Sequence, residues 1–214
     1  MIHMRYNLVA FDMDGTLILG KTCWGVIHEY FGVQSSANNN LIAWDRGQID
    51  YLEFMRRDIL LWQPVPTIKK IREILSSYTL APNAREVVDE VRKKGYRTAI
   101  ITGGLDLLAV MVADDLGIAN VVANELETDG HGNLTGEGII KVDPSRKDET
   151  LADLAEKLGV VPEECVAVGD SRYDVKFINR AGLGVSIGGD LELSQVADVV
   201  IRDFNHFPRL LDYL

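Results

Sequence analysis

The sequence predicts an α/β protein in which a parallel sheet is covered by helices on both faces. Short apolar runs alternate with amphipathic helical patterns along most of the chain, and buried parallel strands have this continuous apolar character. A length of 214 residues with 47% apolar residues is enough for a sizeable core. One stretch, from about residue 18 to residue 80, lacks a convincing strand and interrupts the alternation.

The predicted strands and helices follow one another in a regular order. The strands are the apolar runs Tyr6–Phe11, Arg97–Thr102, Asn120–Ala123, Cys165–Val168 and Gly184–Ile187. The helices are Ala84–Lys94, Leu105–Leu116 and Asp148–Leu158, each with apolar residues at helical spacing and a glycine directly behind it. Residues 125–142 are rich in glycine and predict a surface hairpin.

The interrupting stretch predicts a small helical bundle. Thr22, Asp50 and Thr67 are each placed to cap the start of a helix. All three tryptophans of the chain fall in this stretch and are expected to form its core. We therefore expect a helical cap over residues 18–80, inserted after the first strand of a core made of residues 1–17 and 81–214.

Composition excludes several classes of protein. The net charge of −10 argues against nucleic acid as a partner, and no run of about 18 apolar residues exists to span a membrane. Two cysteines, Cys23 and Cys165, make neither a disulfide framework nor a zinc site. The first residues do not resemble a signal peptide, so we expect a cytoplasmic protein.

Carboxylates follow two of the predicted strands. Asp12 and Asp14 come directly after the first strand, and Asp170 and Asp174 come after Cys165–Val168. Neighbouring strand ends in a parallel sheet would bring these side chains together, and ionised carboxylates that close repel one another. Such a cluster requires a hard divalent cation with oxygen ligands, and Mg²⁺ suits it best.

Two further features suit an anion next to this cluster. Thr102, Gly103 and Gly104 follow another strand and are expected to open a helix, where a hydroxyl and bare backbone N–H groups bind phosphate. Lys147 lies at the start of the predicted helix Asp148–Leu158. Near four carboxylates and a phosphate, this lysine would supply the positive charge that the site needs.

Taken in order, these motifs resemble those of a known family. Asp12-x-Asp14-Gly-Thr, Thr102-Gly-Gly, Lys147 and Gly169-Asp170-x-x-x-Asp174 are similar to the four motifs of the haloacid dehalogenase superfamily. The sequence Phe11-Asp-Met-Asp-Gly-Thr-Leu17 and Leu134-Thr-Gly136 in the hairpin are closer to its phosphoserine-phosphatase-like branch. The resemblance implies a Rossmann-like, doubly wound parallel sheet with a mobile helical cap.

The resemblance also implies roles for individual residues. Asp12 would be the nucleophile that forms an aspartyl-phosphate, and Asp14 would act as general acid and then as general base. Lys147 would stabilise Asp12 and the transferring phosphoryl group. Phosphate oxygens would be held by the loop of Thr102, Gly103 and Gly104.

The implied metal site is magnesium. Asp170 would ligate Mg²⁺ together with Asp12 and the main-chain carbonyl of Asp14, and Asp174 would support these ligands. These roles suit phosphoryl transfer, which depends mainly on positioning and on charge neutralisation.

Two positions concern the leaving group. Arg56 lies where the family has a cap arginine that grips a substrate carboxylate, whereas Lys21 replaces the glutamate that meets the substrate ammonium. If Lys21 faces the substrate, phosphoglycolate or phosphoglycerate should compete well with phosphoserine. Alternatively, Lys21 points to solvent and Glu29 or Asp58 meets the ammonium. Apart from the leaving group, a second departure from the family pattern is Tyr173, where the family often has asparagine.

The sequence therefore predicts a Mg²⁺-dependent phosphomonoester hydrolase, with phosphoserine as the leading substrate. Its partner is expected to be a small phosphorylated metabolite, and the protein a monomer or homodimer. The alternatives are a phosphatase for another small carboxylated phosphomonoester such as phosphoglycolate, a phosphomutase, and a receiver-type domain that accepts phosphate on an aspartate.

Overall fold

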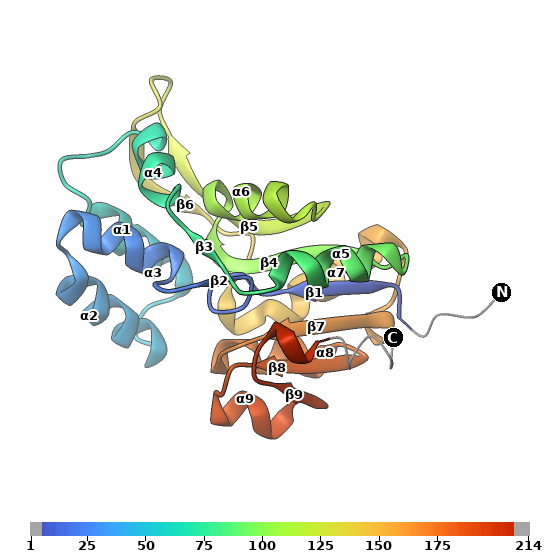
Figure 1. Ribbon diagram of the computed structural model, residues 1–214. Helices are drawn as coiled ribbons and strands as arrows, with labels where there is room; N and C mark the ends of the chain where they lie inside the picture. Colours follow the sequence, from blue (N-terminus) through green and yellow to red (C-terminus); the bar gives the residue numbers. More distant parts are fainter. Residues whose placement is uncertain (1–5, 208–214) are drawn as a thin grey trace.

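A mixed sheet forms the centre of the molecule in the computed structural model, which describes residues 6–207 (Figure 1). Within these residues the sheet has seven strands in the order β6-β5-β4-β1-β7-β8-β9. The strands are β1 (Leu8–Phe11), β4 (Arg97–Leu105), β5 (Asn120–Thr128), β6 (Leu134–Ile139), β7 (Cys165–Gly169), β8 (Leu183–Ile187) and β9 (Val199–Ile201). All neighbours are parallel except β5 and β6, which form the predicted hairpin.

Helices cover both faces of the sheet. One face packs against α5 (Ala84–Lys93) and α6 (Asp106–Leu116). The other packs against α7 (Lys147–Leu158), α8 (Val175–Arg180) and α9 (Leu191–Val196). Single turns of 3₁₀ helix occur at Pro144–Arg146, Pro162–Glu164, Arg172–Asp174 and Phe204–His206.

The central strand shows why the sheet is apolar throughout. Leu8 and Ala10 of β1 point to the core beneath α7, whereas Val9 and Phe11 belong to the core beneath α5 and α6. Every residue of β1 is buried, as expected for a parallel strand covered on both sides. The predicted fold class, a doubly wound α/β sheet, is confirmed.

The segment after β1 is helical, with α1 (Cys23–Phe31), α2 (Gln34–Asp45), α3 (Tyr51–Leu60) and α4 (Ile68–Leu75). Thr22, Asp50 and Thr67 each accept a backbone hydrogen bond at the start of a helix, as predicted. Figure 1 shows α1, α2 and α3 beyond the ends of the central strands. These helices therefore lie over the edge where the carboxylates were expected.

Two features of this segment differ from the prediction. Residues 18–80 contain strand at both ends, because β2 (Ile18–Leu19) pairs antiparallel with β3 (Thr79–Leu80). Two residues are too few to produce a strand pattern in a sequence. Helix α2 was also not predicted, since it begins with polar residues of modest helix propensity and has no side-chain cap.

No helix within residues 6–207 is long and apolar enough to cross a lipid bilayer.

Candidate active site

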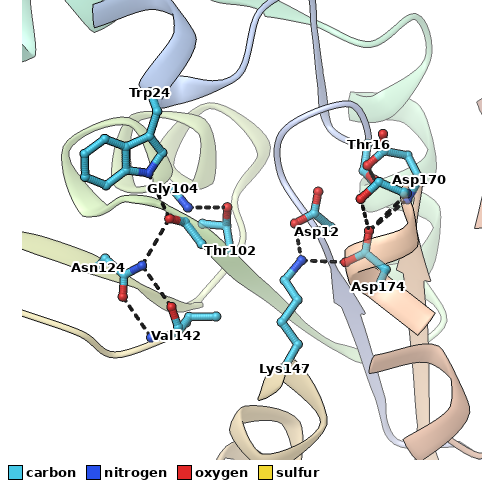
Figure 2. A network of polar contacts seen from close by, with 12 residues as sticks. Asp12, Thr16, Trp24, Thr102, Gly104, Asn124, Val142, Lys147, Asp170 and Asp174 are labelled. Carbon is cyan, nitrogen blue, oxygen red and sulfur yellow. Dashed lines mark hydrogen bonds and ion pairs between the residues drawn. The ribbon is translucent and has the colours of Figure 1, made fainter. Parts of the chain in front are cut away.

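The site lies at the carboxyl ends of β1 and β7, where two aspartates share one lysine. Asp12 directly follows β1, and its backbone N–H donates a 2.8 Å hydrogen bond to the carbonyl of Val168 in β7. Lys147, at the start of α7, pairs its Nζ with Asp12 Oδ1 and with Asp174 Oδ1, the latter at 2.5 Å. Figure 2 shows the lysine between the two carboxylates. All three side chains are buried.

Asp174 is held by the loop that follows β7. Its Oδ2 accepts hydrogen bonds from the backbone N–H groups of Asp170 and Ser171, each at 3.2 Å. Gly15, with φ +85°, lies so close to Asp170 that an added Cβ would be 2.2 Å from the Asp170 carboxylate. Only glycine allows this approach and this backbone conformation together. The glycine after β1 therefore leaves room for the carboxylate of Asp170, which follows β7.

Three of the carboxylates can share a metal ion. Asp12, Asp170 and Asp174 each offer one oxygen, and these oxygens lie within 4.8 Å of one another. Burial, together with repulsion from Asp174, raises the pKa of Asp12 to about 8 and that of Asp170 to about 7, although Lys147 opposes both shifts. One lysine does not neutralise this cluster, so an oxygen-ligated divalent cation fits it.

Lys147 stays charged. Burial alone would lower its pKa, but the charges of Asp12 and Asp174 and their hydrogen bonds outweigh that effect and hold the pKa above its ordinary value.

Asp14 lies beside Asp12, and its carboxylate is held by a backbone N–H group of the helical segment. Its Oδ1 accepts a 2.9 Å hydrogen bond from the backbone N–H of Cys23, the first residue of α1. Burial, followed by repulsion from Asp12, raises the pKa of Asp14 to about 7. A carboxyl group with such a pKa can both hold and release a proton near neutral pH, as a general acid–base requires.

Thr102, Gly103 and Gly104 are close to Asp14 but do not open a helix, which corrects the prediction. They belong to the end of β4, where the pairing register with β5 shifts, and α6 begins only at Asp106. The buried Thr102 Oγ1 accepts a 3.0 Å hydrogen bond from Gly104 N–H. The loop geometry therefore comes from a strand irregularity rather than from a helix end.

Three residues that the sequence did not single out hold this loop. The carbonyl oxygen of Gly103 accepts hydrogen bonds from Trp24 Nε1 at 3.1 Å, Tyr51 Oη at 2.9 Å and Asn124 Nδ2 at 3.0 Å. Trp24 and Tyr51 come from the helical segment and Asn124 comes from β5. Figure 2 shows Trp24 and Asn124 at this loop. The available signal in the sequence was an amide, Asn124, directly after the apolar run Val121–Ala123, and the structure buries that amide completely.

A cavity of about 380 Å³ opens above these groups. Its walls are Asp12, Asp14, Lys147 and the Thr102–Gly104 loop on one side, and residues of α1, α2 and α3 on the other. The catalytic and phosphate-binding residues predicted from the sequence therefore line one cavity. Asp170 and Asp174 lie beside two of them, Asp12 and Lys147.

Lys21 and Arg56 do not lie in this hollow, contrary to the prediction that they bind substrate. Lys21 is 58% exposed and pairs with Glu29, and Arg56 is 46% exposed and pairs with Glu137 at 3.0 Å. Neither lines the cavity. Each has an acidic partner on the surface, which holds the side chain away from the cavity.

Of the two acidic alternatives for Lys21, only one lies at the site. Asp58 of α3 lines the cavity and is 1% exposed, whereas Glu29 lies outside it.

Tyr173, the departure from the family pattern, connects the two sides of the cavity. Its ring stacks on Trp44 of α2, with centroids 5.5 Å apart, and its hydroxyl donates a 2.9 Å hydrogen bond to Asp45. Arg172 pairs with the same carboxylate at 2.5 Å. The loop between Asp170 and Asp174 is thus tied to α2, a helix that the sequence did not predict.

The fold and the site define a doubly wound α/β protein with a metal-competent acidic centre at its strand ends. Residues 9–179 match the haloacid dehalogenase-like hydrolase family. A phosphoserine phosphatase of Archaeoglobus fulgidus is 33% identical over 93% of this chain, which spans 57% of that relative's length. A phosphoserine phosphatase of Methanocaldococcus jannaschii is 29% identical, with 92% of this chain and 93% of that relative covered.

A solved structure agrees with these relatives. A phospho-aspartyl intermediate analogue of phosphoserine phosphatase superposes with a TM-score of 0.81 at 26% identity, over 96% of this chain and 99% of that one. The chain belongs to the haloacid dehalogenase-like hydrolases, and the resemblance inferred from its motifs is confirmed.

Proposed function

We propose that this chain hydrolyses phosphomonoesters through an aspartyl-phosphate formed on Asp12. The observation that carries the proposal is the position of Asp12, which lies on the wall of a cavity, paired with Lys147 and close to Asp14. A carboxylate nucleophile divides hydrolysis into two easier steps.

In the first step, an Asp12 carboxylate oxygen attacks phosphorus, and the bond from phosphorus to the ester oxygen breaks. Asp14 gives its proton to that oxygen, so the leaving group departs as a neutral alcohol. A pKa of about 7 keeps a fraction of Asp14 protonated at neutral pH. Lys147, fixed between Asp12 and Asp174, offsets the negative charge that gathers on the phosphoryl group.

In the second step, Asp14 takes a proton from a water molecule that attacks phosphorus. The bond from phosphorus to Asp12 breaks, which releases inorganic phosphate and restores both carboxyl groups. During both steps, Thr102 and the backbone of Gly103 and Gly104 hold phosphate oxygens, and Asn124 fixes their loop.

We propose Mg²⁺ as the metal of this centre. Asp12, Asp170 and the carbonyl of Asp14 would hold it, and Asp174 would support them while also binding Lys147. When bound, Mg²⁺ neutralises carboxylate and phosphate charge and orients the phosphoryl group for in-line attack.

The helical segment 18–80 is proposed as a cap that closes the cavity and excludes water from the phosphoryl group. Trp24 and Tyr51 reach from it to the Gly103 carbonyl. The cavity beside Asp12 favours an enzyme over a receiver-type domain. A phosphomutase remains the second candidate, and release of free phosphate distinguishes the two. Cytoplasmic location and a monomeric or dimeric state stay predictions.

Hydrolysis of p-nitrophenyl phosphate with Mg²⁺ tests this function without a choice of natural substrate. We expect this ester to react because nitrophenolate is a good leaving group and places little demand on the cap. Hydrolysis should release nitrophenolate and phosphate in equal amounts. The proposal is overturned if folded protein releases neither product. The relatives named phosphoserine phosphatase make phosphoserine the first natural ester to test.

A further inference from the structure

The part of the cavity away from Asp12 is aromatic. Trp24, Trp44 and Phe54 line it, with ring centroids 6.1 Å apart for Trp24–Phe54 and 5.6 Å apart for Trp44–Phe54. Leu41 and Ala37 of α2 add to the same surface. We call these five residues the apolar wall.

Positive charge is scarce in the same space. Among the described residues that line the cavity, the side chains able to carry a positive charge are Lys147 and His28. Lys147 is already bound to Asp12 and Asp174. His28 is buried, and its Nε2 lies 3.2 Å from Asp58 Oδ2. Both side chains therefore already have acidic partners, and neither is left for a second anionic group on the substrate.

The carboxylate of Asp58, which faces His28, lies at the same side of the cavity as the apolar wall. Asp58 is 1% exposed, and its Oδ1 accepts a 2.7 Å hydrogen bond from Asn40 of α2. A carboxylate on the leaving group would exchange water for aromatic rings and would face Asp58 without a cation of its own. Burial of an unpaired charge is costly, and a like charge nearby adds to that cost. The cavity is therefore hostile to acidic leaving groups.

The volume of the cavity and its apolar lining point to the same kind of leaving group. A volume of about 380 Å³ lies in the range of sites that enclose small organic ligands, roughly 300–1,000 Å³. A leaving group as small as serine would leave the apolar wall facing water. An apolar group that covers the rings would remove that surface from water, which is favourable.

We propose that the apolar wall selects phosphomonoesters of apolar, ring-bearing alcohols that carry no carboxylate, and that Asp58 rejects acidic leaving groups. This inference rests on the proposed function, because it names the substrate class of the same site. It places the specificity of the chain in α1, α2 and α3 rather than in Lys21 and Arg56.

Two matched pairs of alkyl phosphates test the substrate class in the wild-type protein. Phosphoserine and phosphoethanolamine differ by one carboxylate, and ethyl phosphate and 2-phenylethyl phosphate differ by one ring. All four release a primary alcohol, so the demand on Asp14 is similar. We expect kcat/KM to be at least about tenfold higher for phosphoethanolamine and for 2-phenylethyl phosphate within their pairs.

The outcomes separate this inference from the function on which it rests. If p-nitrophenyl phosphate is hydrolysed but phosphoserine is used as well as or better than phosphoethanolamine, the substrate class is wrong and the function stands. An ethyl phosphate that matches 2-phenylethyl phosphate overturns the role of the apolar wall. If no ester is hydrolysed with Mg²⁺, both proposals fail.

A variant tests Asp58 itself. Asp58→Asn keeps an oxygen that can accept from Asn40 and removes the charge. We expect the ratio of kcat/KM between phosphoserine and phosphoethanolamine to rise about fivefold or more. Asp153→Asn, an exposed substitution on α7, is the matched control. An unchanged ratio in folded Asp58→Asn overturns its role, and the wild-type panel decides the substrate class even if this variant does not fold.

Discussion

The two sides of the cavity are built in different ways. The side formed by the ends of β1, β4 and β7 is charged, and backbone hydrogen bonds such as those to Asp174 fix it. The side formed by α1, α2 and α3 is mainly aromatic and holds its rings by packing. The comparison teaches that the residues proposed for the chemistry lie at strand ends and at the start of α7, whereas the surface proposed to select the leaving group lies on packed helices.

Removal of the nucleophile should have the largest effect. In Asp12→Asn the amide cannot form an acyl phosphate, and we expect kcat for p-nitrophenyl phosphate to fall by about 10³-fold or more. Steady-state kinetics with Asp153→Asn as control and circular dichroism for folding check the result. Retention of about a tenth of the wild-type kcat in a folded variant would mean that another group attacks phosphorus.

Removal of the metal should come next. The close oxygens of Asp12, Asp170 and Asp174 repel one another without a cation, so treatment with EDTA should abolish activity and Mg²⁺ should restore it. Ca²⁺ should inhibit, because its larger and looser coordination spoils the in-line geometry. Full activity after exhaustive chelation, with metal content measured by mass spectrometry, would refute the metal centre.

The carbonyl oxygen of Gly103 accepts hydrogen bonds from both sides of the cavity, so removing one donor at a time compares the two sides. Asn124→Ala removes the strand-borne donor and leaves the carbonyl of Val142 and the backbone N–H groups of Lys141 and Val142 without their buried partner. We expect kcat to fall by about 10-fold to 100-fold, whereas Tyr51→Phe, which removes one of three donors, should lower it only about 2-fold to 5-fold. A larger loss in Tyr51→Phe would show that the helices, not the strands, set the phosphate loop.

The metal-free protein should become less stable as the pH rises, because the folded state then loses the protons that it holds on Asp12 and Asp170. The folded-state pKa values of Asp12 and Asp170, about 8 and about 7, lie above the ordinary value of 3.8. Folded protein therefore retains protons that the unfolded chain has lost, and stability falls as pH rises from about 4 to about 8. Between pH 5 and pH 8 we expect the free energy of unfolding to fall by about 1 kcal/mol or more.

Urea unfolding at several pH values, with and without Mg²⁺, measures this effect. Mg²⁺ should reduce the fall because it pairs with the ionised carboxylates. Stability of the metal-free protein that rises across this interval would contradict the assigned environment of the cluster.

The contact between Tyr173 and α2 should have the smallest effect. Asp45→Asn weakens the ion pair with Arg172, which is half exposed, and such pairs contribute about 0.2–1 kcal/mol. We expect KM to rise about 2-fold to 5-fold with kcat nearly unchanged. Arg56→Ala, which also loses an exposed ion pair but lies outside the cavity, is the matched control. An equal change in both variants would argue against a role of this contact in holding the cap.

The contrast between the strand-end side and the helical side of the cavity also explains which features could be predicted from the sequence. Asp12, Asp14, Asp170 and Asp174 are found by their positions after predicted strands, because a strand end places its next residues at a known edge of the sheet. Lys147, at a helix start, is found only through its resemblance to the family motif. Apolar runs and helical spacing likewise identify the five central strands and the covering helices α5, α6 and α7. The covering helices α8 and α9, of six residues each, were not predicted. The predicted features depend on local pattern, and the structure places them where the pattern indicates.

The rest depends on contacts between distant residues. Lys21 and Arg56 match the family motif by position, but Glu29 and Glu137 pair with them on the surface. Helix α2 has a polar sequence, and its contacts with α3 and with Tyr173 exist only in the folded chain. The role of Asn124 follows from the Gly103 carbonyl that it meets across two strands.

Trapping the covalent intermediate tests the central claim most directly. Asp14→Asn removes the base for the second step, whereas p-nitrophenyl phosphate needs no acid in the first. Rapid mixing of this variant with the ester and Mg²⁺ should give a burst of about one equivalent of nitrophenolate per site. Mass spectrometry after acid quenching should then find a phosphoryl group on the peptide that contains Asp12. Linear release without a burst, or a phosphoryl group on another residue, would contradict the account.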